Sequence, residues 1–259
     1  MAPAGGSDDR REIIYGLQAV REALRAGTRP LSRIMVVRPD RQFADLVRLA
    51  RAAQVPVHIE PKRTLDRLVT GGNHQGVIGM VAAKGYADPL DILQYARGRQ
   101  EPPFLVILDG VEDPHNLGAV IRTAEAAGVH GVILPERRAA GLTGTVAKVS
   151  AGALEHLRIG RTPNVSRLIE HLQTEGLWVY ALDPRAAKPY TALDLTGPVA
   201  LVLGGEGKGI RPGVLDKCDQ RARIPMQGHV DSLNVSVAGA VLMYEVLRQR
   251  MLQAKTQEN

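Results

Sequence analysis

A glycine-rich loop is the first part of this sequence whose composition suggests that it binds a ligand. In LVLGGEGKGIRP (residues 201–212), an apolar run predicts a buried strand, and four glycines follow it within six residues. Such turns often bind phosphate, because their N–H groups can approach a ligand with no Cβ in the way. Gly209 follows Lys208 where a P-loop needs Ser or Thr, and the glycine spacing does not match a G-x-G-x-x-G dinucleotide site. A flexible strand-to-helix turn remains the alternative.

This loop is one of three polar segments that each follow a predicted strand. The other two are LDGVEDPHNLGAVIRTAEAAG (residues 108–128) and IPMQGHVDSLNVSVAGAVLMYEVL (residues 224–247). Their candidate functional side chains, with Glu206 of the loop, are Asn116, Arg122, Ser232 and Asn234. Asn116 stands at a predicted helix start, where Asn is a favoured cap. Ligands of open α/β sheets gather at the carboxyl ends of the strands, so these side chains are expected to share one edge of a sheet.

Alternating strands and helices are predicted to position these segments. The strands are expected at 104–108, 129–134, 177–182, 199–203 and 222–224, and the helices at 117–127, 165–175 and 233–250. Continuous apolar strands between helices favour a mostly parallel sheet covered on both faces, so the fold class is α/β.

The first hundred residues predict a separate, smaller module. Helices are expected at 16–26 and 40–53, a short one after Pro61, and strands at 33–37, 55–59 and 77–82. We therefore expect an α/β domain at residues 12–84, a linker at 85–102 that has room for one helix, and the larger domain at 103–255.

The charge of the chain is unevenly distributed. Net charge is +6, and all of the excess lies in residues 1–100, which hold 16 Lys and Arg against 10 Asp and Glu. Such an excess favours a polyanionic partner such as RNA, with an ordinary solvated basic surface as the alternative. Only 3% of the chain is aromatic, which weakens any model of stacking platforms for single strands.

Several classes of protein are disfavoured by composition. The single cysteine, Cys218, excludes internal disulfides and thiolate zinc sites, and no metal is expected. No apolar run approaches 18 residues and the start has no signal-peptide core, so we expect a soluble, cytoplasmic protein without a membrane partner.

The three segments together resemble the motifs of the SpoU-family (TrmH-like) RNA ribose 2′-O-methyltransferases of the SPOUT superfamily. The matching patterns are N-L-G-A-x-x-R-T-A, L-G-x-E-G-x-G and I-P-M-x-G-x-V-x-S-L-N-V-S-V-A, in that order. Upstream, IYGLQAVREAL (residues 14–24) and NHQG (residues 73–76) resemble the N-terminal RNA-binding domain of the RlmB-type branch. The resemblance covers roughly residues 12–250.

This resemblance implies a fold, a cofactor and a set of residues. The fold would be a SPOUT methyltransferase domain, a trefoil-knotted and mostly parallel sheet, behind a small α/β RNA-binding domain. The cofactor would be S-adenosylmethionine, bound in the knot mostly by backbone groups. Its binding residues would be Gly204, Gly205, Gly207, Ile224, Met226 and Leu233. The catalytic set would be Asn116, Arg122, Glu206, Ser232 and Asn234.

The role of Arg122 stays open between two chemistries. In the family this arginine is often regarded as the general base that removes the proton of the 2′-hydroxyl. Deprotonating a free guanidinium so that it can act as a base at pH 7 costs roughly 7 kcal/mol. We favour a guanidinium that grips the target phosphate and the 2′-oxygen while the proton leaves to water.

Other candidate residues have simpler alternatives. Glu206 would orient Arg122 or a ribose hydroxyl, unless it is only a solvated loop carboxylate. Ser232 has helix capping as its alternative, and Asn234 has plain helix-end polarity. Lys148, Ser150 and His74 are weaker candidates for RNA contact.

The resemblance also implies partners. The RlmB-type branch methylates a guanosine of 23S ribosomal RNA, and a homodimer would complete each site. A tRNA ribose methyltransferase, a thiostrepton-resistance-type rRNA methyltransferase and a catalytically silent RNA-binding protein are the alternatives.

Overall fold

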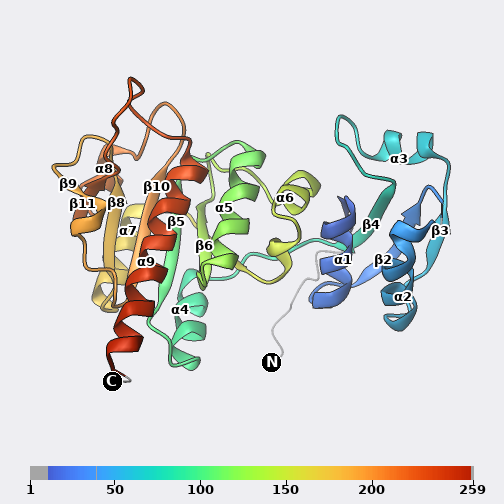
Figure 1. Ribbon diagram of the computed structural model, residues 1–259, viewed down its shortest axis with the longest axis horizontal. Helices are drawn as coiled ribbons and strands as arrows, with labels where there is room; N and C mark the ends of the chain where they lie inside the picture. Colours follow the sequence, from blue (N-terminus) through green and yellow to red (C-terminus); the bar gives the residue numbers. More distant parts are fainter. Residues whose placement is uncertain (1–10, 39, 258–259) are drawn as a thin grey trace, which may run out of the picture. The chain divides into compact units, whose positions relative to one another are not determined.

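The computed structural model describes residues 11–38 and 40–257, which form two compact units (Figure 1). The N-terminal unit contains residues 11–38, 40–85 and 141–156, and the C-terminal unit contains residues 86–140 and 157–257. This division differs from the predicted boundaries at 12–84, 85–102 and 103–255. The predicted linker folds into the C-terminal unit, and a segment of the larger predicted domain folds with the N-terminal unit.

A four-stranded sheet forms the N-terminal unit, in the order β1-β4-β2-β3. Only β2 and β3 are parallel, while β1 and β2 both pair antiparallel to β4. The strands are β1 (Arg11–Tyr15), β2 (Leu31–Val36), β3 (Val57–Ile59) and β4 (Val77–Ala82). The helices are α1 (Leu17–Ala26), α2 (Ala44–Ala52), α3 (Lys62–Leu68) and, from the later segment, α6 (Gly144–Val149). Short 3-10 turns lie at Arg41–Phe43 and Ala153–Glu155.

The later segment joins this unit because its apolar side chains are buried there. Val146, Ala147 and Leu154 are at most 2% exposed, and α6 packs on β1. Glu155 is 3% exposed and accepts from Arg29, whose guanidinium also bonds Glu12 and the carbonyl of Ala82. A buried charge is tolerated only when it is paired and hydrogen-bonded, as Glu155 is here.

The C-terminal unit is built on a seven-stranded sheet in which every pairing is parallel. Its order is β7-β6-β5-β10-β8-β11-β9. The strands are β5 (Phe104–Asp109), β6 (Gly131–Pro135), β7 (Arg158–Thr162), β8 (Trp178–Leu182), β9 (Lys188–Pro189), β10 (Val199–Gly204) and β11 (Gln220–Arg223). The predicted parallel α/β sheet is therefore confirmed.

Helices cover both faces of this sheet, which explains why its central strands are apolar throughout (Figure 1). One core cluster joins side chains of α4 (Pro89–Gly98), α7 (Val165–Thr174) and α8 (Pro212–Leu215) to inward residues of the strands. On the other face, α5 (Pro114–Ala126) packs against α9 (Val235–Gln257), which also contacts β10. A further 3-10 turn lies at Tyr190–Ala192.

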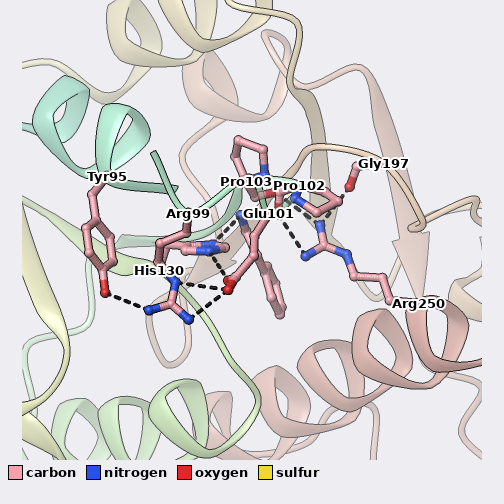
Figure 2. Close-up of polar contacts among 9 residues, drawn as sticks. Tyr95, Arg99, Glu101, Pro102, Pro103, His130, Gly197 and Arg250 are labelled. Carbon is pink, nitrogen blue, oxygen red and sulfur yellow. Dashed lines mark hydrogen bonds and ion pairs between the residues drawn. The ribbon is translucent and has the colours of Figure 1, made fainter. Parts of the chain in front are cut away.

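A polar cluster fastens the amino end of β5, opposite the strand ends that carry the predicted site (Figure 2). His130 accepts from the Phe104 N–H through Nδ1, so its Nε2 carries the proton that it donates to Glu101. Arg250 of α9 donates to the carbonyls of Pro102, Pro103 and Gly197. The residues that precede β5 are therefore held to the helical layer.

Three strands were missed by the sequence analysis, namely β1, β7 and the two-residue β9. Both β1 and β7 carry arginines among their apolar residues, so neither shows a continuous apolar run. The last helix continues to Gln257, beyond the predicted end at Arg250.

Candidate functional site

The carboxyl ends of β8, β10 and β11 enclose a cavity of about 410 Å³, which we call the first cavity. All six predicted cofactor residues line it, namely Gly204, Gly205, Gly207, Ile224, Met226 and Leu233. Its apolar wall also includes Leu203, Ile210 and Ala238. Its volume lies in the range of small-molecule sites, which bury most of a ligand against apolar groups.

The glycine loop has this composition because neighbouring backbone leaves no room for side chains. A Cβ on Gly204 would overlap the backbone of Gly209, and one on Gly205 would overlap the carbonyl of Gly110. These glycines therefore allow the loops after β5 and β10 to touch.

Asp109, the last residue of β5, anchors the far end of the same loop. The side chain of Asp109 is 1% exposed. Its carboxylate accepts from the backbone N–H of Arg211 at 2.8 Å and forms an ion pair with the guanidinium of Arg211 at 2.7 Å. Sequence reasoning missed this pair. The available signal was a carboxylate directly after an apolar strand, with an arginine closing the glycine loop.

Three of the five predicted catalytic residues form one hydrogen-bonded network. Glu206 Oε1 accepts from Asn116 Nδ2 at 2.7 Å and from Asn234 Nδ2 at 2.9 Å. Asn234 Nδ2 also donates to Asn116 Oδ1 at 2.9 Å. The other carboxylate oxygen of Glu206 has no protein donor among the described residues, so it is available to a ligand.

The cap of α5 differs from the predicted one, and the cap of α9 is a residue other than Ser232, for which capping was the alternative role. Asp113, not Asn116, caps α5, since its Oδ1 accepts from the His115 N–H. Asn116 lies one turn later and is free to bond across the site. Asn234 caps α9 by accepting from the Ser236 N–H at 2.9 Å, and Ser232 is an exposed loop residue that lines the first cavity.

Arg122 lies apart from this network within the chain. It is exposed, lines neither cavity described here and has no hydrogen-bond or ion-pair partner among the described residues. Six helical residues after Asn116 correspond to about 240° of rotation and about 9 Å of rise, so the two side chains project from different faces of α5.

A second cavity of about 470 Å³ adjoins the first. Gly205, Glu206, Lys208, Gly209 and Val235 line both cavities. The remaining wall comes from the ends of β5 and β6 with the loops that follow them, from Asn116 and from Arg211. Glu206, to which both asparagines of the network donate, thus lies at the boundary of the two cavities.

The weaker candidates have structural roles in the N-terminal unit. His74 is 4% exposed and bonds Asp66 and the Gly76 N–H. Lys148 donates to the Asn73 carbonyl, and burial lowers the pKa of its ammonium. Ser150 is fully buried and donates to the Ala147 carbonyl.

Within residues 11–38 and 40–257, no helix is both long and apolar enough to cross a membrane. No three His, Cys, Asp or Glu side chains in that part of the chain are grouped as metal ligands would be.

Fold and site together define an α/β enzyme with its ligand cavities at the carboxyl edge of a parallel sheet. Residues 103–244 match the model of the SpoU rRNA Methylase family, and residues 13–87 match the model described as RNA 2′-O ribose methyltransferase substrate binding. The chain belongs to the SpoU methylase family, whose members are RNA 2′-O-ribose methyltransferases.

Individual relatives agree with this assignment. A putative TrmH family tRNA/rRNA methyltransferase of Bacillus subtilis, YacO, is 42% identical over 242 residues, which cover 93% of this chain and 97% of the relative. A crystal structure of an RNA 2′-O ribose methyltransferase matches with a TM-score of 0.76 and 30% identity, covering 94% and 90% of the two chains. An S-adenosylmethionine-bound rRNA methyltransferase from Sinorhizobium meliloti matches with a TM-score of 0.75 and 26% identity, covering 92% and 87%.

Proposed function

We propose that this protein transfers the methyl group of S-adenosylmethionine to the 2′-hydroxyl of a guanosine in 23S ribosomal RNA, in the cytoplasm. The observation that carries the proposal is the Asn116–Glu206–Asn234 network at the boundary between the two cavities. An enzyme that transfers a group from one substrate to another needs polar groups that orient the substrates where their two binding sites meet. The ribosomal target is supported by the family model and by the S. meliloti rRNA methyltransferase, which aligns with both units of this chain.

The first cavity has the properties that the cofactor needs. Its glycine loop presents backbone that a Cβ would block, which suits close contact with a flat purine. Its charged lining is Asp183, Glu206 and Asp231 with Arg185 and Lys208, which suits a ligand that carries a sulfonium, an ammonium and a carboxylate group. We assign cofactor binding to Gly204, Gly205, Gly207, Ile224, Met226 and Leu233. When bound, the cofactor supplies a methyl group already activated by the positive sulfur.

Glu206 is assigned the positioning of the ribose. Its Oε1 is fixed by two amides, so Oε2 is held in place without a protein donor and can accept a hydrogen bond from the ribose. Orientation of the hydroxyl toward the methyl group lowers the entropic part of the barrier. Ser232, on the rim of the first cavity, is assigned a contact with the same substrates.

A homodimer is proposed because one catalytic residue lies away from the network. Arg122 lacks a partner among the described residues, and α9 exposes an apolar stripe at seven-residue spacing, with Val237 and Tyr244 each 50% exposed and Met251 54% exposed. Such a stripe is typical of a helix that packs against another helix. A second copy on this face would cover the stripe and supply Arg122, whose guanidinium would stabilise charge that develops on the 2′-oxygen.

The trefoil knot also remains a proposal. The chain passes from β11, which lies next to the edge strand β9, through residues 224–234 to α9, which packs back on β10 and α5. This return past the glycine loop supports a threaded chain, although most folds avoid one.

Methyl transfer to mapped RNA tests the function. The purified chain is incubated with radiolabelled S-adenosylmethionine and with unmodified ribosomal RNA or tRNA, and the modified ribose is located by its resistance to alkaline cleavage. We expect one guanosine of 23S RNA to be labelled. Labelling confined to tRNA would favour the tRNA alternative, and a different rRNA nucleotide would favour the thiostrepton-resistance type. Cofactor binding without transfer to any RNA would overturn the proposal.

Glu206→Gln separates catalysis from folding in the same assay. The amide oxygen can still accept from both asparagines, while the free oxygen becomes an N–H donor. We expect kcat to fall by about a hundredfold, the scale for loss of one preorganised polar contact. Glu170→Gln on α7, which lines neither cavity, is the matched control and should keep full activity.

A further inference from the structure

The second cavity is lined by four cationic and four acidic side chains, and most of the cations have no ion-pair partner among the described residues. Arg137, Arg138, Lys208 and Arg211 all line it. Arg211 is paired with Asp109, but the side chains of the other three have no hydrogen-bond or ion-pair partner among the described residues. A guanidinium that forms no ion pair with a carboxylate has its N–H donors available to bind an anion.

Most carboxylates of the same wall are already engaged with protein donors. Asp109 binds Arg211, Asp113 caps α5, and Glu206 accepts from two asparagines. Only Glu112 is exposed without a partner in the described part of the chain. All four carboxylates keep their charge, but three of them are held by protein donors, whereas the side chains of Arg137, Arg138 and Lys208 are free to bind an added anion.

The backbone of the loop after β6 allows two consecutive arginines to line one cavity. Successive side chains of an extended chain point to opposite sides. Arg138 instead has a φ of 60°, in the left-handed region that a non-glycine residue adopts at a cost of about 1 kcal/mol or more. The loop is held by the Glu136 N–H bond to Thr162 and the Ala140 N–H bond to Val111.

We infer that Arg137 and Arg138 bind the phosphodiester on the 3′ side of the methylated nucleotide. The inference rests on the proposed function, because it places the target ribose at Glu206, which lines both cavities. In RNA the 2′-hydroxyl is on the carbon next to the one that carries the 3′-phosphate. A ribose directed into the first cavity therefore has its 3′-phosphodiester close to the second. Two planar guanidinium forks suit the paired oxygens of this group.

Substitution of both arginines tests this assignment. Relative to wild type, Arg137→Gln with Arg138→Gln should raise the KM for RNA at least tenfold and leave the affinity for S-adenosylmethionine within twofold. The log–log salt slope of RNA binding should fall by about 1.4 to 1.8, the value for two lost phosphate contacts. Arg167→Gln on α7 is the control, since this exposed arginine lines neither cavity and its side chain has no partner in the described part of the chain.

A neutral linkage in the RNA identifies which phosphate is bound. Oligonucleotides that contain the mapped site carry one methylphosphonate, either 3′ or 5′ of the target nucleotide. The 3′ substitution should weaken binding to wild type and have little further effect on the double variant. Inorganic phosphate at millimolar concentration should compete only weakly, because it lacks the ribose contacts.

The inference and the proposed function fail differently. An unchanged KM and salt slope in the double variant, or equal sensitivity of both proteins to the 3′ methylphosphonate, would overturn the phosphate assignment while methylation persists. Competition by inorganic phosphate as strong as that of the oligonucleotide would reduce the cavity to a general anion site and also overturn it. Failure of the wild-type protein to methylate RNA would instead overturn the function. The salt slope is measured without methyl transfer and is still informative in that case.

Discussion

Asn234 combines two roles that sequence reasoning treats as alternatives. Its Oδ1 caps α9 through the Ser236 N–H, and its Nδ2 donates to Asn116 and Glu206. One side chain therefore fixes both the start of the helix and the polar network. This arrangement keeps the network in register with the apolar helix face that supports it.

Asn234→Asp is predicted to separate these two roles. The carboxylate can still accept from Ser236, so thermal stability should change by less than that of Asn234→Ala, which loses the cap and about 1 kcal/mol. It cannot donate to Glu206 and adds a like charge beside it, so methylation should fall by a hundredfold or more. Melting temperature and methylation rate are measured for both variants. Equal activity of Asn234→Asp and wild type would show that the amide is not required.

His130 is predicted to make stability depend on pH. Burial is the main cause that lowers the pKa of this imidazole, although Glu101 opposes the shift and Arg250 and Arg99 add to it. The folded protein then keeps His130 neutral at a pH where the unfolded chain is protonated. The contribution of His130 to the free energy of unfolding is complete above about pH 6.5. It is lost as the pH falls through the lowered pKa, and the free energy of unfolding changes by no more than about 1.4 kcal/mol per pH unit.

Urea unfolding between pH 8 and pH 5 measures this dependence. His130→Asn should flatten the profile in the acidic part of that range, because the amide can still bond Phe104 and Glu101 but does not titrate. The exposed His58→Asn is the control and should follow wild type. If the free energy of unfolding of His130→Asn falls with pH as steeply as that of wild type, groups other than His130 cause the pH dependence.

At the scale of elements, the segment 141–156 is the least expected part of the structure. It follows two strands of the catalytic sheet in sequence, yet α6 and the turn at Ala153–Glu155 fold with β1 and α1. Removal of residues 12–84 would expose the apolar side chains of this segment. RNA binding by the N-terminal unit is therefore better tested by neutralising exposed arginines such as Arg63 and Arg67 than by truncation.

The Arg29–Glu155 pair is predicted to hold this segment in place. Glu155→Ala leaves the buried Arg29 guanidinium without its main acceptor, which costs about 3–5 kcal/mol for a buried pair. The double variant Arg29→Met with Glu155→Leu should recover part of that loss. Amide exchange of residues 146–154 gives the local measurement, and we expect protection to fall most in Glu155→Ala.

Glu170→Ala, which breaks the exposed pair with Lys217, is the control and should change the free energy of unfolding by less than about 1 kcal/mol. Unchanged exchange in Glu155→Ala would contradict the role of the pair.

At the scale of the whole molecule, the position of Arg122 bears on assembly. The Asn116–Glu206–Asn234 network is complete within one chain, whereas Arg122 and the exposed face of α9 have no partner among the described residues. A symmetric dimer would place the same surface of each copy against the other. Each site could then combine three residues of one chain with one arginine of its partner.

Mixed dimers are predicted to recover activity. Arg122→Ala and Asn234→Ala should each be nearly inactive, but co-refolded chains should regain about a quarter of wild-type activity, because half of the dimers hold one intact site of two. Arg122→Lys should recover little on its own, since a point charge does not reproduce the planar fork. Mixed dimers that stay inactive, with subunit exchange verified by mass, would mean that each chain builds its own complete site.

The sequence by itself determined the parallel sheet and the residues around the first cavity. Strands such as Phe104–Asp109 are buried on both faces, which leaves an uninterrupted apolar run, and the glycines of residues 204–209 mark where backbones touch. Tertiary structure decided the rest. The partners in the Arg29–Glu155 pair are 126 residues apart in sequence, and those in the Asn116–Asn234 pair are 118 residues apart. No local pattern predicts which distant side chain will satisfy a buried polar group. The caps at Asp113 and Asn234, the fold of residues 141–156 and the separation of Arg122 from the network all depend on such long-range contacts, because polar groups taken out of water must be paired by whatever the fold brings near.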